Sequence, residues 1–95
     1  MAVVEVRIPT IFHKVVGGRS VQASGGTVGQ VLKDLEKNFP GLNGRITDPQ
    51  GKLNNFIIIF LNEQDIRFKK ELDTPLQDGD VLAVLPAIAG GMFIR

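Results

Sequence analysis

The chain has 95 residues, of which 43% are hydrophobic, so it can build one domain with a modest core and is not expected to be disordered. Eleven Lys and Arg residues are interspersed with ten Asp and Glu residues, and the net charge of +1 makes nucleic acid and anionic membranes unsuitable partners. The absence of cysteine excludes disulfides, thiolate catalysis and thiolate metal sites. No signal peptide or membrane-spanning run is recognisable, so we expect a cytoplasmic protein.

The first 24 residues show the alternation of strands. Apolar and charged side chains alternate over residues 2–8, which predicts a half-buried strand. Gly17-Gly18 is a glycine pair suited to a chain reversal, and the alternation resumes over residues 19–24. We therefore expect these two segments to form a hairpin.

The clearest helix begins after Thr27. Thr27-Val28-Gly29-Gln30 fits a capping box, in which the Thr27 hydroxyl accepts from the Gln30 amide and the Gln30 side chain reaches back. One apolar stripe follows at helical spacing: Val28, Val31, Leu32, Leu35 and Phe39. Pro40 ends the helix near Phe39, and we expect the stripe to face the core.

Two apolar segments lie in the second half of the chain. Residues 42–55 are typical of a loop, with a turn at Asp48-Pro49-Gln50-Gly51, and residues 56–61 are apolar at both parities, which predicts a strand covered on both faces. The pattern leaves open which parity points inward. A short strand is expected over 66–68, and a turn at Asp78-Gly79-Asp80 leads into a last strand over 81–85.

The order of these elements is strand, strand, helix, strand, short strand, strand. A single helix among strands indicates an α+β protein with a mixed sheet of four to five strands over one main helix. Because the helix lies in the connection between them, the first and last strands are expected to be parallel neighbours.

Two consecutive glycines, Gly90 and Gly91, follow the last strand. Without Cβ atoms, their backbone can enter a channel too narrow for side chains. Residues 86–91, extended at about 3.3 Å each, would reach on the order of 20 Å from the domain. We expect a domain over 1–86 and an arm over 87–91, followed by residues 92–95. The alternative is a merely flexible terminus.

Several short motifs follow one another along residues 3–91: Val21-Gln22-Ala23-Ser24-Gly25 before Thr27-Val28-Gly29, Leu61-Asn62 before Asp65-Ile66-Arg67, Asp78-Gly79-Asp80, and Leu85-Pro86-Ala87-Ile88-Ala89-Gly90-Gly91. Each motif is weak alone, but in this order and at these spacings the chain resembles the β-grasp, ubiquitin-like sulfur carriers of the ThiS/MoaD family. Three further motifs are most similar to the CysO type, which carries sulfur to cysteine synthesis: Ile8-Pro9-Thr10, Gly51-Lys52-Leu53 and Ala89-Gly90-Gly91.

This resemblance implies a protein substrate, not an enzyme, with no bound cofactor. In the family, an E1-like adenylating enzyme uses ATP to activate the terminal glycine carboxylate, and a sulfur donor then replaces AMP to leave a thiocarboxylate. Carried over to this chain, Gly91 bears the reactive carboxyl group and Gly90 accompanies it. The sulfur acceptor is a biosynthetic enzyme that makes cysteine, molybdopterin, thiazole or a specialised thio-metabolite.

The chain departs from the family pattern because it continues past Gly91 with Met92-Phe93-Ile94-Arg95. The carboxyl group that should be activated is therefore held in the Gly91–Met92 amide. Similar short extensions are removed from some carriers by a JAMM-type zinc peptidase, so we expect cleavage between Gly91 and Met92. The alternative is a relative that never carries sulfur.

The expected partner surface combines apolar residues near the 56–61 strand and the arm with a polar rim. It consists of Phe56, Ile58, Phe60, Asp65, Arg67, Pro86 and Ile88. Two other functions remain open. The chain can be a non-covalent ubiquitin-like module or small synthase subunit, or a modifier conjugated to lysines.

Other polar residues give no sign of catalysis or metal binding. His13 is the only histidine, and a structural or solvated role is favoured for it. Asp78 and Asp80 fit a strand connection better than a Mg²⁺ site, and the acidic residues show no paired spacing typical of acid–base catalysis. We therefore expect neither a metal site nor an enzyme.

Overall fold

The computed structural model describes residues 1–87. Its strands and helices are, in chain order, β1 (Ala2–Arg7), α1 (His13–Val16), β2 (Ser20–Gly25), α2 (Val28–Asn38), β3 (Ile57–Leu61), β4 (Gln64–Asp65) and β5 (Val81–Pro86). Short 3-10 helices lie at Thr10–Phe12, Pro40–Leu42, Ile66–Phe68 and Glu71–Asp73.

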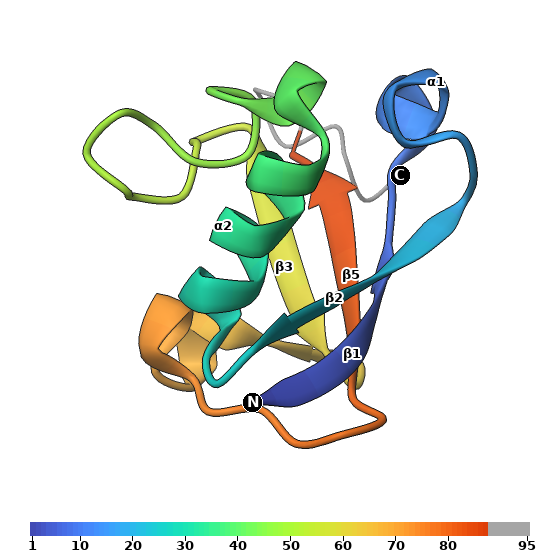
Figure 1. Ribbon diagram of the computed structural model, residues 1–95. Coiled ribbons are helices and arrows are strands. Elements are labelled where there is room, and N and C mark those ends of the chain that lie inside the picture. Colours follow the sequence, from blue (N-terminus) through green and yellow to red (C-terminus); the bar gives the residue numbers. More distant parts are fainter. Residues whose placement is uncertain (88–95) are drawn as a thin grey trace.

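Within residues 1–87, the strands form one five-stranded mixed sheet in the order β2-β1-β5-β3-β4. β1 pairs antiparallel with β2 and parallel with β5, while β3 pairs antiparallel with β5 and β4. The helix α2 lies across one face of this sheet (Figure 1). The predicted mixed sheet over one main helix is confirmed, and so is the parallel pairing of the first and last strands.

The core lies between α2 and the sheet. Four residues of the α2 stripe are fully buried: Val28, Val31, Leu32 and Leu35. They join inward-facing residues of three strands: Val4, Val6, Ile57, Ile59, Leu61, Leu82 and Val84. Phe39 packs against this cluster but stays half-buried, because it is the C-cap residue and its backbone has left helical geometry at φ −130°.

The start of α2 is set by local hydrogen bonds. The Thr27 hydroxyl accepts from the Gln30 amide at 3.3 Å, as the sequence predicts. The Gln30 side chain reaches back one residue further than expected and accepts from the Gly26 amide at 2.7 Å. β2 meets α2 so closely that a Cβ on Gly25 would lie 2.7 Å from the Val31 nitrogen, so only glycine fits there.

Two expectations from the sequence need correction. β1 and β2 do pair, but Gly17-Gly18 is not a simple hairpin turn, because a 3-10 helix and α1 precede it and Gly17 ends α1 at φ +79°. Residues 66–68 form a 3-10 helix, not a strand, since the Asp65 carboxylate accepts from the Arg67 amide at 2.9 Å and caps the turn. The 42–55 loop also contributes Leu42 and Ile46 to the core, both fully buried.

Candidate functional site

No α-helix of residues 1–87 lies on the face of the sheet opposite α2, which we call the open face (Figure 1). β3 supplies apolar side chains to both faces. Ile57, Ile59 and Leu61 are buried toward the helix, whereas Ile58 and Phe60 point to the open face and are half-buried. The sequence left undecided which residues of this strand point inward, and the structure shows that the odd-numbered ones do. The residues Ile58 and Phe60, predicted for the partner surface, share the outward parity.

β5 continues this apolar surface beside β3. Ile58 pairs with Leu85 and Phe60 pairs with Ala83 across the two strands. On its other side Ala83 pairs with Arg7 of β1, so one row across the sheet runs from Phe60 through Ala83 to Arg7. The small Ala83 side chain leaves a hollow at the centre of the row.

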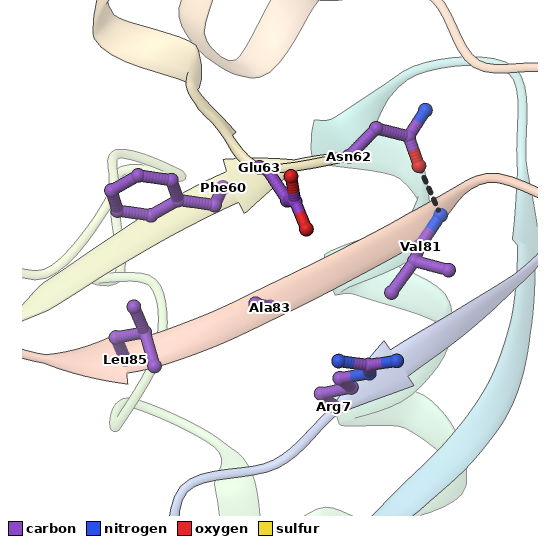
Figure 2. Close-up of a pocket in the computed structure, with 7 residues that line it drawn as sticks. All are labelled: Arg7, Phe60, Asn62, Glu63, Val81, Ala83 and Leu85. Carbon is purple, nitrogen blue, oxygen red and sulfur yellow. Dashed lines mark hydrogen bonds between the residues drawn. The ribbon is translucent and has the colours of Figure 1, made fainter.

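This hollow is a shallow pocket of about 500 Å³ on the open face (Figure 2). It is lined by Arg7, Phe60, Asn62, Glu63, Val81, Ala83 and Leu85. Of these residues, only Phe60 belongs to the partner surface that the sequence predicts. The other lining residues come together because β5 lies between β1 and β3. In the sequence, the alternation of residues 81–85 was the signal that could have placed Ala83 and Leu85 on the same face as Phe60.

Asn62 lies at one end of the pocket and binds the start of β5 through hydrogen bonds. Its backbone amide donates to the Val81 carbonyl at 2.9 Å, and its side-chain oxygen accepts from the Val81 amide at 3.0 Å. Its side-chain nitrogen donates to the Asp80 carboxylate at 3.0 Å. These three hydrogen bonds lock the β3–β4 turn to the start of β5.

The turn predicted at Asp78-Gly79-Asp80 is confirmed. The Asp78 carboxylate accepts from the Val3 amide at 2.8 Å, and the Asp80 carboxylate accepts from the Gln77 amide at 2.9 Å. Both acidic groups are thus acceptors for backbone amides. Along residues 1–87, no three or more His, Asp or Glu side chains gather as a metal ion would require.

Asp65 and Arg67, predicted for the polar rim, pair with each other. The Arg67 guanidinium donates to one Asp65 carboxylate oxygen through Nε at 3.0 Å and through a terminal nitrogen at 2.7 Å. This hydrogen bonding lowers the pKa of Asp65 from its ordinary value. Neither residue lines the pocket, and their role at an interface remains a prediction.

The end of β5 lies beside the open face. Pro86 pairs with Ile57, and the Ala87 amide donates to the Phe56 carbonyl at 2.8 Å, so main-chain pairing extends one residue past the predicted domain end at 86. Phe56 is 63% exposed at this edge. Four residues named in the predictions, Ile88, Gly90, Gly91 and Met92, lie outside the described residues.

His13 has a structural contact near the other end of β1. Its Nε2 donates to the Ile8 carbonyl at 2.7 Å, which ties α1 to the end of the strand. Throughout the described part of the chain, no helix combines the length and the hydropathy needed to cross a membrane.

A mixed sheet wrapped around one helix, with an open apolar face beside the last strand, defines a ubiquitin-like protein of the β-grasp class. The family model that matches is described as the ThiS family and covers residues 6–91. The chain therefore belongs to the ThiS family.

Known proteins similar to this chain agree with that assignment. Sulfur carrier protein CysO of Mycobacterium tuberculosis is 48% identical over 91 residues, covering 93% of this chain and 98% of the relative. Small archaeal modifier protein 3 of Haloferax volcanii is 33% identical over 90 residues, covering 92% and 97%. The crystal structure of the Amycolatopsis orientalis BexX/CysO complex contains a chain with TM-score 0.82 and 42% identity, covering 93% of this chain and 99% of that one.

Proposed function

We propose that this chain is a sulfur carrier whose Gly91 carboxylate is adenylated and then converted to a thiocarboxylate. Membership of the ThiS family, the Gly90-Gly91 pair and the similarity to a sulfur carrier protein support the proposal. In this proposal the chain is a protein substrate, and the catalytic groups belong to its partner enzymes. An E1-like adenylating enzyme binds ATP and provides the active site, and a biosynthetic enzyme takes the sulfur.

The observation that carries this proposal is the position of the end of β5. Pairing with β3 holds the chain through Ala87, directly beside the open apolar face. Gly91 is the fourth residue after Ala87, so it is at most about 14 Å from Ala87. An enzyme that docks on the open face would therefore have the Gly-Gly pair within reach of its active site.

The chemistry requires a free carboxylate at Gly91. One of its oxygens attacks the α-phosphate of ATP and displaces pyrophosphate. A sulfur nucleophile then attacks the acyl carbon of the resulting acyl-adenylate, so that a C–S bond forms and AMP leaves. In the full chain the Gly91 carbonyl belongs to an amide with Met92. We propose that a JAMM-type zinc peptidase hydrolyses this bond, with a zinc-bound water as its nucleophile.

We propose that the docking surface for the adenylating enzyme is the open face and its edge. It comprises Phe56, Ile58, Phe60 and Pro86 with Ile88 of the arm, while Asp65 and Arg67 are its candidate polar rim. An exposed apolar face of this kind marks an interaction surface. The A. orientalis structure, in which CysO is in complex with BexX, supports a carrier that works by binding another protein.

A second candidate is a modifier that joins Gly91 to lysines of other proteins. The 33% identity to small archaeal modifier protein 3 favours it. A modifier and a sulfur carrier share the activation step and differ in the final acceptor. For a sulfur carrier, the acceptor is a biosynthetic enzyme that makes cysteine, molybdopterin, thiazole or a thio-metabolite. A non-covalent module or synthase subunit would need no chemistry at Gly91.

The test compares a chain ending at Gly91 with the full chain. Each is incubated with ATP, the adenylating enzyme of the same organism and a sulfur donor, and its intact mass is measured. We expect a thiocarboxylate on the shorter chain only, and none on a Gly91→Val variant of it. A thiocarboxylate on full-length protein that still carries Arg95 would contradict the proposed maturation, and no adenylate on either chain would contradict the proposed function.

A further inference from the structure

Glu63 has a backbone conformation that does not suit glutamate. It lies in the two-residue turn between β3 and β4 at φ +74°, after Asn62 at φ +48°. This geometry is that of a type I′ turn, in which the second position is most often glycine because a side chain is strained there. Strained residues of this kind concentrate at functional sites.

The surrounding hydrogen bonds hold Glu63 in this conformation. Asn62 is bound through its backbone and its side chain to Val81 and Asp80, so the turn cannot relax by shifting along β5. Among residues 1–87, in contrast, the Glu63 side chain has no hydrogen-bond donor and no cation as a partner. Three hydrogen bonds thus attach the turn to β5, while the Glu63 carboxylate is exposed and is left unpaired by residues 1–87.

The position of this carboxylate indicates what it meets. Glu63 lines the open-face pocket from the β3 side and Arg7 lines it from β1, with Val81 and Ala83 of β5 between them. Figure 2 shows the two charged side chains on the same side of the sheet. Arg7 makes one loose contact, with Glu5 at 3.5 Å, and remains 65% exposed. The pocket therefore has an apolar floor, a carboxylate at one wall and a guanidinium at the other.

We propose that Glu63 and Arg7 determine which adenylating enzyme the carrier accepts. The matching enzyme places an apolar side chain in the pocket over Ala83, a lysine or arginine against Glu63, and an aspartate or glutamate against Arg7. Charges placed in this way fix the orientation of a partner and exclude partners of the wrong polarity. The inference rests on the proposed function, because it assumes that this face docks the adenylating enzyme.

The chain offers a matched control for Glu63. Glu71 also has a positive φ, +53°, and is exposed, but it lies in the 3-10 helix Glu71–Asp73 that contacts α2, and it does not line the pocket. Glu63→Gly and Glu71→Gly thus remove the same charge and relieve the same kind of strain at two places. Both variants are expected to melt at least as high as the parent.

The experiment measures adenylation of chains ending at Gly91 by the adenylating enzyme of the same organism, as kcat and KM for the carrier. We expect Glu63→Gly to raise KM several-fold and Glu63→Lys or Arg7→Glu to raise it at least tenfold, with kcat unchanged, because docking precedes the chemistry. Glu71→Gly should leave both constants unchanged. The swapped double variant Glu63→Arg/Arg7→Glu should stay as poor as the single variants.

Three results would overturn the proposed role of Glu63 and Arg7. If the double variant regains the parent KM, the two side chains act on each other and the inference is wrong. Unchanged KM values for all pocket variants would overturn it while leaving the proposed function intact, since the parent would still be adenylated. A parent that sediments as a dimer and becomes monomeric with Glu63→Lys would show that a second copy occupies the face, which also overturns it.

Discussion

Ile58 and Ile59 are identical neighbours in β3 that face opposite sides of the sheet, and alanine at each should have opposite consequences. Ile59 is 1% exposed and belongs to the core cluster, whereas Ile58 is half-buried on the open face. We expect Ile59→Ala to weaken folding strongly. Ile58→Ala should weaken docking and leave the fold nearly intact.

The expected magnitudes follow from this burial. Removing three carbons from the fully buried Ile59 should lower the free energy of unfolding by about 2–5 kcal/mol, because the transfer energy is lost and a cavity remains. In a domain of this size each kcal/mol lowers Tm by about 4–8 °C, so the loss is about 8 °C or more. Ile58 already contacts water, and its truncation should cost about 1 kcal/mol or less.

Urea denaturation of both variants and the parent measures these differences, with an unchanged m value as the control for two-state unfolding. The same variants are also prepared as chains that end at Gly91, and the KM for their adenylation measures docking on the open face. Equal losses of stability at the two positions would refute the assignment of parity in β3. An Ile58→Ala variant adenylated with the parent's KM would refute docking on this face.

Three further predictions concern the fold. Leu35→Ala should cost about 2–5 kcal/mol and Phe39→Ala clearly less, since Phe39 is half-buried, and a larger loss at Phe39 in thermal unfolding would contradict this ordering. Gly25→Ala should lower Tm, because its Cβ would meet the Val31 backbone at 2.7 Å, and an unchanged Tm would show that β2 can move away. The hydrogen bond from Arg67 favours the charged form of Asp65 and lowers its pKa in the folded state. The Asp65 carboxylate should therefore stabilise the protein above its unfolded-state pKa of about 3.8, and this stabilisation should be lost as the pH falls through the lower folded-state pKa. The stability of Asp65→Asn should therefore approach that of the parent between pH 5 and pH 2, and a constant difference over that range would be the contrary result.

Features that depend on nearest neighbours could be predicted from the sequence. Thr27 caps α2, the apolar stripe through Leu35 faces the sheet, and Asp78-Gly79-Asp80 turns the chain into β5, as expected. Each of these is specified within a few residues, by a hydroxyl near an exposed amide, by helical spacing or by a short turn. The Gly90-Gly91 motif likewise indicated the family without any structure.

The parallel pairing of β1 with β5 was predicted, but most other features that depend on contacts between distant segments were not. Both parities of β3 are apolar, so only the placement of α2 on one side of the sheet makes Ile59 core and Ile58 surface. One local feature was also missed: residues 66–68 look like a strand but form a 3-10 helix, because the Asp65 carboxylate caps the Arg67 amide two residues away. Leu42 and Ile46 are buried although their loop is rich in turn residues.

The candidate site depends mostly on contacts between segments that are distant in the sequence. Arg7 and Glu63 are far apart in the chain, and they line one pocket because β5 lies between β1 and β3. The sequence predicted that β1 and β5 are neighbours, but no local pattern places β3 on the other side of β5. The apolar and turn residues were visible in the sequence, but which of them share the open face depends on the pairing of strands that are distant in sequence.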